Sequence, residues 1–150
     1  MSRAFVKEDA EVVERLTRRR AASGLPPGAI NYMTTDGAER LRARLVELRG
    51  ISSKEHDEEI GHLEDTLASA TIIEPQPKRD TVTFGARVTV SDAEGKLETY
   101  RIVGVDEVDF DSANVSWVSP IARSLLGAVV SQRVSLDGGT LPAWTVVKIE

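Results

Sequence analysis

The sequence contains no cysteine, which excludes disulfide bridges, thiolate metal ligands and a cysteine nucleophile. It has only two histidines, His56 and His62, and their separation of six positions does not match the i, i+4 spacing of a helical metal pair. We therefore expect no metal and no cofactor, and little chemistry of the chain's own.

Long hydrophobic runs are also missing. No apolar stretch approaches the length that crosses a bilayer, and residues 1–9 become acidic where a secretion signal would turn hydrophobic. The formal net charge of −5 argues against tight nucleic-acid binding over the whole surface, although a local basic patch remains open. The missing hydrophobic runs predict a cytoplasmic protein with no membrane association.

The N-terminal residues 1–31 are predicted to be an extension that contains a helix. Residues 11–22 place Val12, Val13 and Leu16 on one helical face, and the breaker at residues 24–28 ends the pattern. Arginines surround the apolar face: Arg15, Arg18, Arg19 and Arg20. Two interpretations remain open, a loosely docked helix with a solvated basic end, or an arm that contacts a partner protein, nucleic acid or a second copy of the chain.

Residues 32–74 have the pattern of two helices joined by a short turn. The first helix begins in the capping sequence at residues 34–39, and a second capping box spans residues 52–55. Such helices are antiparallel neighbours, and arms of roughly 15 residues would be about 22 Å long. Their apolar stripes are Leu41, Leu45 and Leu48, then Ile60, Leu63 and Leu67. Arginines on the first helix should attract carboxylates on the second, but each exposed pair contributes only about 0.2–1 kcal/mol, so the leucine seam should decide stability.

Residues 75–80 form a proline-containing linker, and from residue 81 the hydrophobic period changes to two. This pattern predicts a second domain over residues 81–150 with strands around one helix, which is an α+β arrangement. The expected strands are 81–90, 97–103, 115–118, 129–136 and 143–149, with turns at 93–96 and 137–139.

The single helix of this domain has its own start and stop signals. Ser119 is a capping residue, Pro120 suits the first helical position, and Gly127 can adopt the left-handed conformation that ends a helix. The apolar face of the helix is predicted to comprise Ile121, Leu125 and Leu126.

Three motifs in the second domain, at residues 84–90, 100–107 and 116–127, resemble the C-terminal domain of the bacterial Gre transcription elongation factors. Residues 32–37 and the leucines that follow resemble the start of that family's N-terminal coiled coil. The resemblance implies a short antiparallel helical hairpin followed by an FKBP-like antiparallel sheet domain with one short helix. It also implies bacterial RNA polymerase as the partner, with indirect contact to nucleic acid in the transcription complex.

This sequence differs from the family that it resembles at the tip of the hairpin. Gre factors that stimulate RNA cleavage have arms roughly twice as long as those inferred here, and an acidic loop at the tip helps to hold a catalytic Mg²⁺ in the polymerase. That motif has no counterpart between Leu48 and Ile60, so no catalytic residue is carried over. Four carboxylates near the new turn are candidate substitutes, but the favoured interpretation is a solvated acidic helix face: Glu55, Asp57, Glu58 and Glu59.

The family docks to the polymerase through the surface around the capped helix. The corresponding contact candidates in this sequence are Asp106, Glu107, Ser119, Pro120, Ile121, Ala122 and Arg123. Arg123 is the strongest of them, because a charged residue on the outer side of a short helix is available to a carboxylate on a partner. This sequence has Ala128 where the family usually has a lysine, directly after the helix-ending Gly127. It has Ser131-Gln132 where the family usually has a Gly-Asp pair.

The favoured hypothesis is a binding protein and not an enzyme, a regulator that docks near the polymerase secondary channel without inducing transcript cleavage. Relatives with short hairpins, known as regulators of nucleoside diphosphate kinase, show that such a design exists. One alternative is a cleavage-stimulating factor that uses residues 55–59. Another is a prolyl isomerase, although with 5% aromatic residues the chain has few rings for the pocket that this activity needs.

Overall fold

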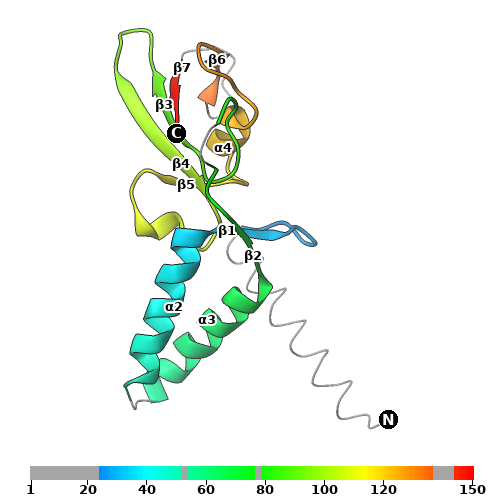
Figure 1. Ribbon diagram of the computed structural model, residues 1–150, viewed down its shortest axis with the longest axis vertical. Coiled ribbons are helices and arrows are strands. Elements are labelled where there is room, and N and C mark those ends of the chain that lie inside the picture. The colour runs from blue at the N-terminus through cyan, green and yellow to red at the C-terminus, as the bar shows by residue number, and fades with distance from the viewer. Residues whose placement is uncertain (1–23, 52–53, 77–78, 137–143) are drawn as a thin grey trace.

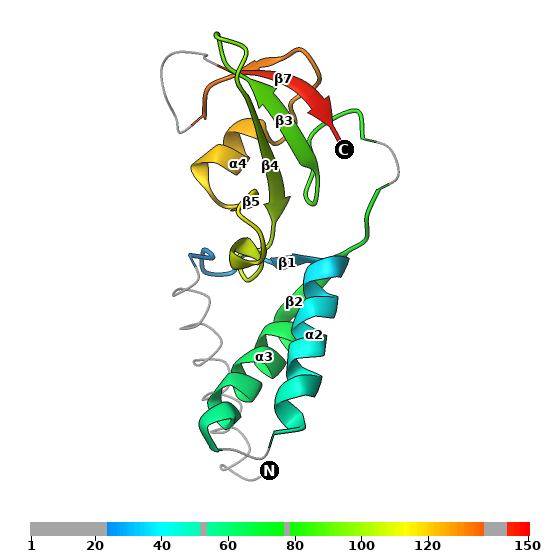
Figure 2. The same ribbon diagram turned by 90° about the vertical axis from the view of Figure 1, so that its left-hand side faces the viewer.

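The computed structural model describes residues 24–51, 54–76, 79–136 and 144–150. They form an α+β protein with a helical unit at one end and a sheet unit at the other (Figure 1, Figure 2). The helix predicted over residues 11–22 lies outside the described residues. No helix in the described part of the chain is both long and apolar enough to cross a membrane.

The helical unit consists of α2 (Thr35–Arg49) and α3 (Asp57–Ser69). Thr34 caps α2, because its Oγ1 accepts a hydrogen bond from Gly37 N at 3.1 Å. With 15 and 13 residues, the two helices are about 22 and 20 Å long. Their core buries Met33, Ala38, Leu41, Leu45, Leu48 and Leu63, with Ile60 and Leu67 partly buried beside it.

The start of α3 differs from the predicted capping box. A 3₁₀ turn, Lys54–His56, precedes the helix, and His56 occupies the cap position without a capping hydrogen bond from its side chain. Residues 52–53 of the predicted box lie outside the described residues. Three carboxylates in the first turn, Asp57, Glu58 and Glu59, supply the negative charge that favours a helix N-terminus.

A parallel pair of strands that the sequence analysis did not predict closes the base of the helical unit. β1 (Asn31–Thr34) pairs with β2 (Ala70–Ile73), and Asn31 lies opposite Ala70. Parallel strands need a long crossover connection, which α2 and α3 together provide. At four residues each, these strands are too short to show a hydrophobic period.

The sheet unit is a five-stranded sheet in the order β5-β4-β3-β7-β6. Four of its strands pair antiparallel, but β4 and β5 are parallel, so the expectation of an antiparallel sheet is wrong. The connection over residues 104–113, which contains a 3₁₀ turn at Val108–Phe110, returns the chain and makes the parallel pairing possible. The strands are β3 (Arg87–Ser91), β4 (Leu97–Val103), β5 (Asn114–Ser116), β6 (Arg133–Val134) and β7 (Trp144–Ile149).

The strand predicted over 97–103 is confirmed as β4, but several other strands are shorter than predicted. Gly85 has a φ of 84°, which interrupts the strand expected over 81–90, so that only Arg87–Ser91 is regular. Ser131 has a φ of 74°, and this turn limits the strand expected over 129–136 to Arg133–Val134. Residues 115–118 contribute only the end of β5, and residues 137–143 lie outside the described residues.

The capped helix is confirmed as α4 (Pro120–Leu125). Ser119 Oγ accepts a hydrogen bond from Ala122 N at 3.2 Å, and Gly127 has the expected left-handed conformation with a φ of 85°. The prediction for Leu126 is wrong, since its side chain is 36% exposed. Leu126 is the C-cap and has non-helical angles, so it does not continue the apolar face of the helix.

Replacing Ser119 with alanine should lower the free energy of unfolding by about 1 kcal/mol, because Ala122 N loses its partner in the first turn of α4. Urea unfolding followed by tryptophan fluorescence measures the change. Ser124→Ala on the same helix is the matched control, since the Ser124 hydroxyl donates to Pro120 O at an exposed position and caps no N–H group. Equal effects of the two substitutions would contradict the capping role.

Candidate functional site

The predicted contact residues on α4 divide into exposed and buried ones. Pro120 and Arg123 are exposed, and Ser119 is half-buried with its hydroxyl in the helix cap. Ile121 packs against the core of the sheet unit, and Ala122 is completely buried within it. The helix turns Ala122 inward, so the structure does not present this predicted contact residue at the surface. Arg123 remains the charged side chain that α4 presents to solvent.

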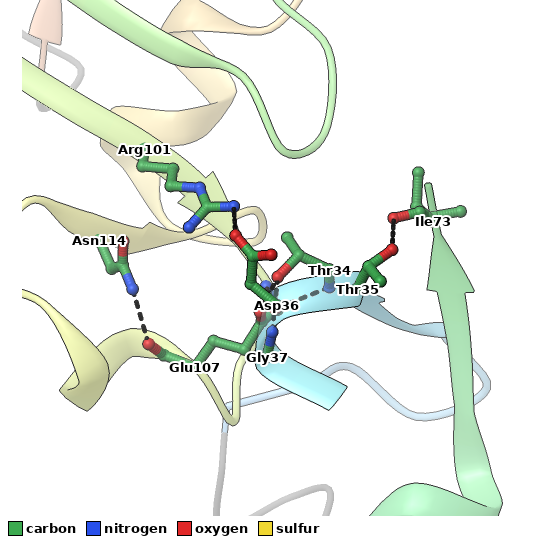
Figure 3. Close-up of polar contacts among 9 residues, drawn as sticks. Thr34, Thr35, Asp36, Gly37, Ile73, Arg101, Glu107 and Asn114 are labelled. Atoms are coloured by element: carbon green, nitrogen blue, oxygen red, sulfur yellow. Dashed lines mark hydrogen bonds and ion pairs between the residues drawn. The ribbon is translucent and has the colours of Figure 1, made fainter. Parts of the chain in front are cut away.

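Glu107 was expected on the docking surface, but it is only 2% exposed and lies between the two units. Its carboxylate accepts hydrogen bonds from Thr34 N at 3.0 Å and from Gly104 N at 2.7 Å, and a third from the Thr34 hydroxyl. Its backbone oxygen accepts a further bond from Asn114 Nδ2 at 2.9 Å (Figure 3). These bonds hold the side chain in the interior, so the structure does not present this predicted contact residue at the surface.

Two glycines make room for the Glu107 carboxylate. A Cβ at Gly37 would lie 1.9 Å from Glu107 Oε1, and a Cβ at Gly104 would lie 2.9 Å from Glu107 Oε2. At Gly104 the same atom would also lie 2.2 Å from the backbone oxygen of Tyr32. All three distances are shorter than ordinary van der Waals contacts, so the packing around Glu107 requires glycine at both positions.

Further contacts surround Glu107 and fix the helical unit against the sheet unit. Arg101 on β4 binds Asp36 in the first turn of α2 at 3.0 Å (Figure 3). Tyr32 on β1 packs against the rings of Phe84 and Trp117, with centroids 5.7 and 5.2 Å away. We call this set of contacts, centred on Glu107, the joint.

Asp106, beside Glu107, lies at the edge of the joint. Its carboxylate accepts a hydrogen bond from Asn31 Nδ2 at 3.4 Å, and Asn31 Nδ2 also donates to Ser69 Oγ at 3.3 Å. Burial raises the pKa of Asp106, while the hydrogen bond from Asn31 and the charge of His62 oppose that rise. Asp106 therefore links the sheet unit to the base of α3, and it is not a freely exposed carboxylate.

The sequence analysis missed the joint. The residues 32–37 were noted for their resemblance to a family, but no role followed from them. One signal was available: a glycine in the first turn of a helix is unfavourable, so Gly37 indicates close approach by another group.

The four predicted tip carboxylates lie near the start of α3. Glu59 binds Arg44 on α2, with Nε to Oε1 at 3.0 Å, and Glu64 binds Arg49 at 2.9 Å, which confirms the predicted attraction between the helices. The hydrogen bonds that Arg44 donates to Glu59, and then to Glu47, raise the pKa of its guanidinium group. Glu55, Glu58, Glu59 and His62 line an open depression of about 350 Å³. Within the described residues, no three carboxylates or histidines are arranged to hold a metal ion.

The family model of the C-terminal domain of the GreA/GreB transcription elongation factors matches residues 76–150, which is half of the chain. The chain belongs to the GreA/GreB family. The match includes α4 and the side of the joint that carries Gly104, Glu107 and Asn114.

Several GreA and GreB proteins are similar to the chain. A transcription elongation factor GreA from Ralstonia nicotianae is 32% identical over 130 residues, which are 85% of this chain and 73% of that protein. A GreA from Sphingopyxis alaskensis is 38% identical over 96 residues, 61% of this chain and 59% of that protein. A GreB from Neisseria meningitidis is 36% identical over 86 residues, which are 56% of this chain and 53% of that protein. The chain thus spans little more than half of the length of the latter two GreA/GreB relatives.

Among solved structures, the GreA factor homolog 1 (Gfh1) of Thermus thermophilus matches 81% of this chain and 99% of its own, with 25% identity and a TM-score of 0.40.

Proposed function

We propose that this GreA/GreB family member is a transcription elongation regulator that binds RNA polymerase near its secondary channel and does not induce transcript cleavage. The sheet unit would dock on the polymerase, and the helical unit would project toward the channel. Family membership supports the transcriptional role, since the similar GreA and GreB proteins are named as transcription elongation factors.

The observation that carries the proposal is the length of α2 and α3. At about 22 and 20 Å they are short arms, whereas the cleavage-stimulating members that the resemblance implies have arms about twice as long. A carboxylate must approach Mg²⁺ to about 2.1 Å to coordinate it. Carboxylates at the tip of a shorter probe would stop well short of a metal that a long probe reaches.

The state of the tip carboxylates also supports a role without cleavage. Glu59 is bound to Arg44, so the partner helix already neutralises part of the acidic turn. The described tip residues form no metal-binding group of three.

The aromatic contacts argue against the isomerase alternative. Tyr32 from the helical unit packs against Phe84 and Trp117, and Phe84, Tyr100, Trp117 and Trp144 all pack against the core of the sheet unit. These rings are committed to the protein's own interior instead of lining a pocket for a proline peptide.

Purified protein should bind core RNA polymerase with a micromolar or tighter dissociation constant, and Arg123→Glu should weaken this binding about tenfold, which is about 1.4 kcal/mol. Fluorescence anisotropy of a labelled protein measures both values. Lys96→Glu, an equal charge change in the exposed turn between β3 and β4, is the control and should bind like the unaltered protein. Absence of micromolar binding would contradict the proposal.

The same preparation should leave the RNA of backtracked polymerase complexes uncut. Stimulated cleavage that is lost in an Asp57→Ala, Glu58→Ala double variant would instead establish the alternative of a cleavage factor. Cleavage by the intact protein at any rate above the intrinsic rate of the polymerase contradicts the second half of the proposal.

A further inference from the structure

Three exposed aliphatic side chains lie in the short segment between α4 and β6 (Figure 1). Leu126, Val129 and Val130 are 36%, 44% and 51% exposed, whereas Ala128 between them is buried. Single exposed apolar residues are common on protein surfaces, but a group of three in one short segment indicates an interaction surface. We call Leu126, Val129 and Val130 the apolar patch.

The backbone under the apolar patch is held by hydrogen bonds to two other parts of the sheet unit. Gly127 N donates to Val82 O at 2.8 Å, and Val82 N donates to Ala128 O at 2.9 Å. At the other end of the segment, Ser131 N donates to Val146 O on β7 at 2.7 Å. Because the backbone is already fixed, a partner binds the patch without the cost of ordering a loop.

The turn that carries the two valines has an unfavourable backbone conformation. Ser131 has a φ of 74°, in the left-handed region that residues with a Cβ seldom adopt. Gln132 stabilises the turn, since its N donates to Val129 O at 3.1 Å and its Oε1 accepts from Val129 N at 3.2 Å. The chain thus holds a disfavoured turn whose valines face solvent. Core packing does not explain these exposed valines, whereas a contact with a partner does.

The charge around the apolar patch favours an acidic protein partner. Between Asp111 and Asp137 the sequence has no acidic residue, although the whole chain has 24. Arg123 is exposed on α4 three positions before Leu126, so the two side chains lie close together. One cation beside three aliphatic side chains suits a protein surface that offers apolar groups and a carboxylate.

Two other occupants fit the apolar patch less well. A symmetric contact between two copies would bring the patch against itself, so that two Arg123 guanidinium groups would meet without a carboxylate from this segment. Nucleic acid is bound through several cations or through aromatic rings. The patch and Arg123 together supply one cation and no ring.

We propose that the apolar patch and Arg123 form one docking surface for RNA polymerase, with the patch against apolar groups of the polymerase and Arg123 against a carboxylate. This inference rests on the proposed function and names the part of the sheet unit that makes the contact. Burial of the patch supplies affinity, while Arg123 supplies orientation and a salt-dependent attraction. The surface does not need the buried candidates Glu107 and Ala122.

The double variant Val129→Ser, Val130→Ser removes aliphatic groups without changing the charge. Its dissociation constant for core RNA polymerase, measured by fluorescence anisotropy of the labelled full chain, should be at least tenfold higher than that of the unaltered protein. The dependence of its binding on salt should be unchanged, because no ion pair is lost. Arg123→Gln should instead reduce the salt dependence.

Two controls separate loss of this contact from a general effect of the substitutions. Leu97→Ser, at the start of β4, alters a side chain that is 61% exposed outside the apolar patch, and this variant should bind like the unaltered protein. Val129→Ile, Val130→Ile keeps the aliphatic surface and should keep the binding. Circular dichroism establishes that each variant is folded.

Unchanged binding by the double serine variant would overturn this inference while the proposed function stands. Absence of binding by the unaltered protein would overturn both. Analytical ultracentrifugation tests for contact between copies. Self-association of the unaltered protein that the two serines abolish would also overturn the inference, because the apolar patch would then be an interface between copies.

Discussion

Replacing Glu107 with alanine is expected to lower the free energy of unfolding by about 2–4 kcal/mol. The substitution leaves the N–H groups of Thr34 and Gly104 buried without an acceptor, and each such group costs about 1–3 kcal/mol. The relief of desolvating a carboxylate offsets part of this loss. Glu107→Gln should lower the free energy of unfolding by less. Its remaining side-chain oxygen can still accept hydrogen bonds from the backbone N–H groups, but its amide NH₂ is a donor where the carboxylate oxygen was an acceptor.

Two spectroscopic probes separate loss of stability from loss of coupling between the units. Both tryptophans, Trp117 and Trp144, belong to the sheet unit, whereas most of the helical circular dichroism comes from α2 and α3. The unaltered protein should show coincident urea transitions by the two probes, and Glu107→Ala should make the helical transition occur at lower urea. Asp109→Ala, at an exposed position in the same connection, is the control. Coincident, unshifted transitions in Glu107→Ala would contradict the central role of Glu107 in the joint.

The elements predicted correctly are those that local chemistry determines. α4 has a cap, a proline and a terminal glycine within a few residues, and β4 follows a turn and is rich in Thr, Tyr, Ile and Val, so each can be predicted without knowledge of the rest of the chain. The arginine and carboxylate pairs between α2 and α3 follow from two helices joined by a short connection.

The elements missed depend on segments that are far apart in the sequence. β1 and β2 are short, parallel and separated by two helices, so neither strand has a pattern of its own. Glu107 was named as a docking candidate because the family resemblance implied it, and its burial depends on the approach of Thr34 from the helical unit, which no local pattern shows. The helix α4 was predicted correctly as a helix, but its role in docking stays a prediction, and two of the candidate residues, Glu107 and Ala122, are buried in this structure.

Gly104→Ala is expected to destabilise the protein by about 3 kcal/mol or more, because the new methyl group would lie 2.2 Å from the backbone oxygen of Tyr32 and strand β1 would have to move. Gly37→Ala creates a different clash, at 1.9 Å from Glu107 Oε1, and that obstacle is a side chain. We expect a loss of about 2–3 kcal/mol there. Urea unfolding followed by circular dichroism measures both changes.

Combining each glycine replacement with Glu107→Ala distinguishes the two clashes. Once the carboxylate is gone, alanine at position 37 meets no clash with Glu107 and has a better helix propensity than glycine by about 1 kcal/mol. In the Glu107→Ala background, Gly37→Ala should therefore change from destabilising to neutral or stabilising, which is a coupling energy of about 2–4 kcal/mol. Gly104→Ala should remain strongly destabilising, because the Tyr32 backbone oxygen is still in place. Additive effects for Gly37→Ala and Glu107→Ala would show that the glycine does not serve to admit the carboxylate.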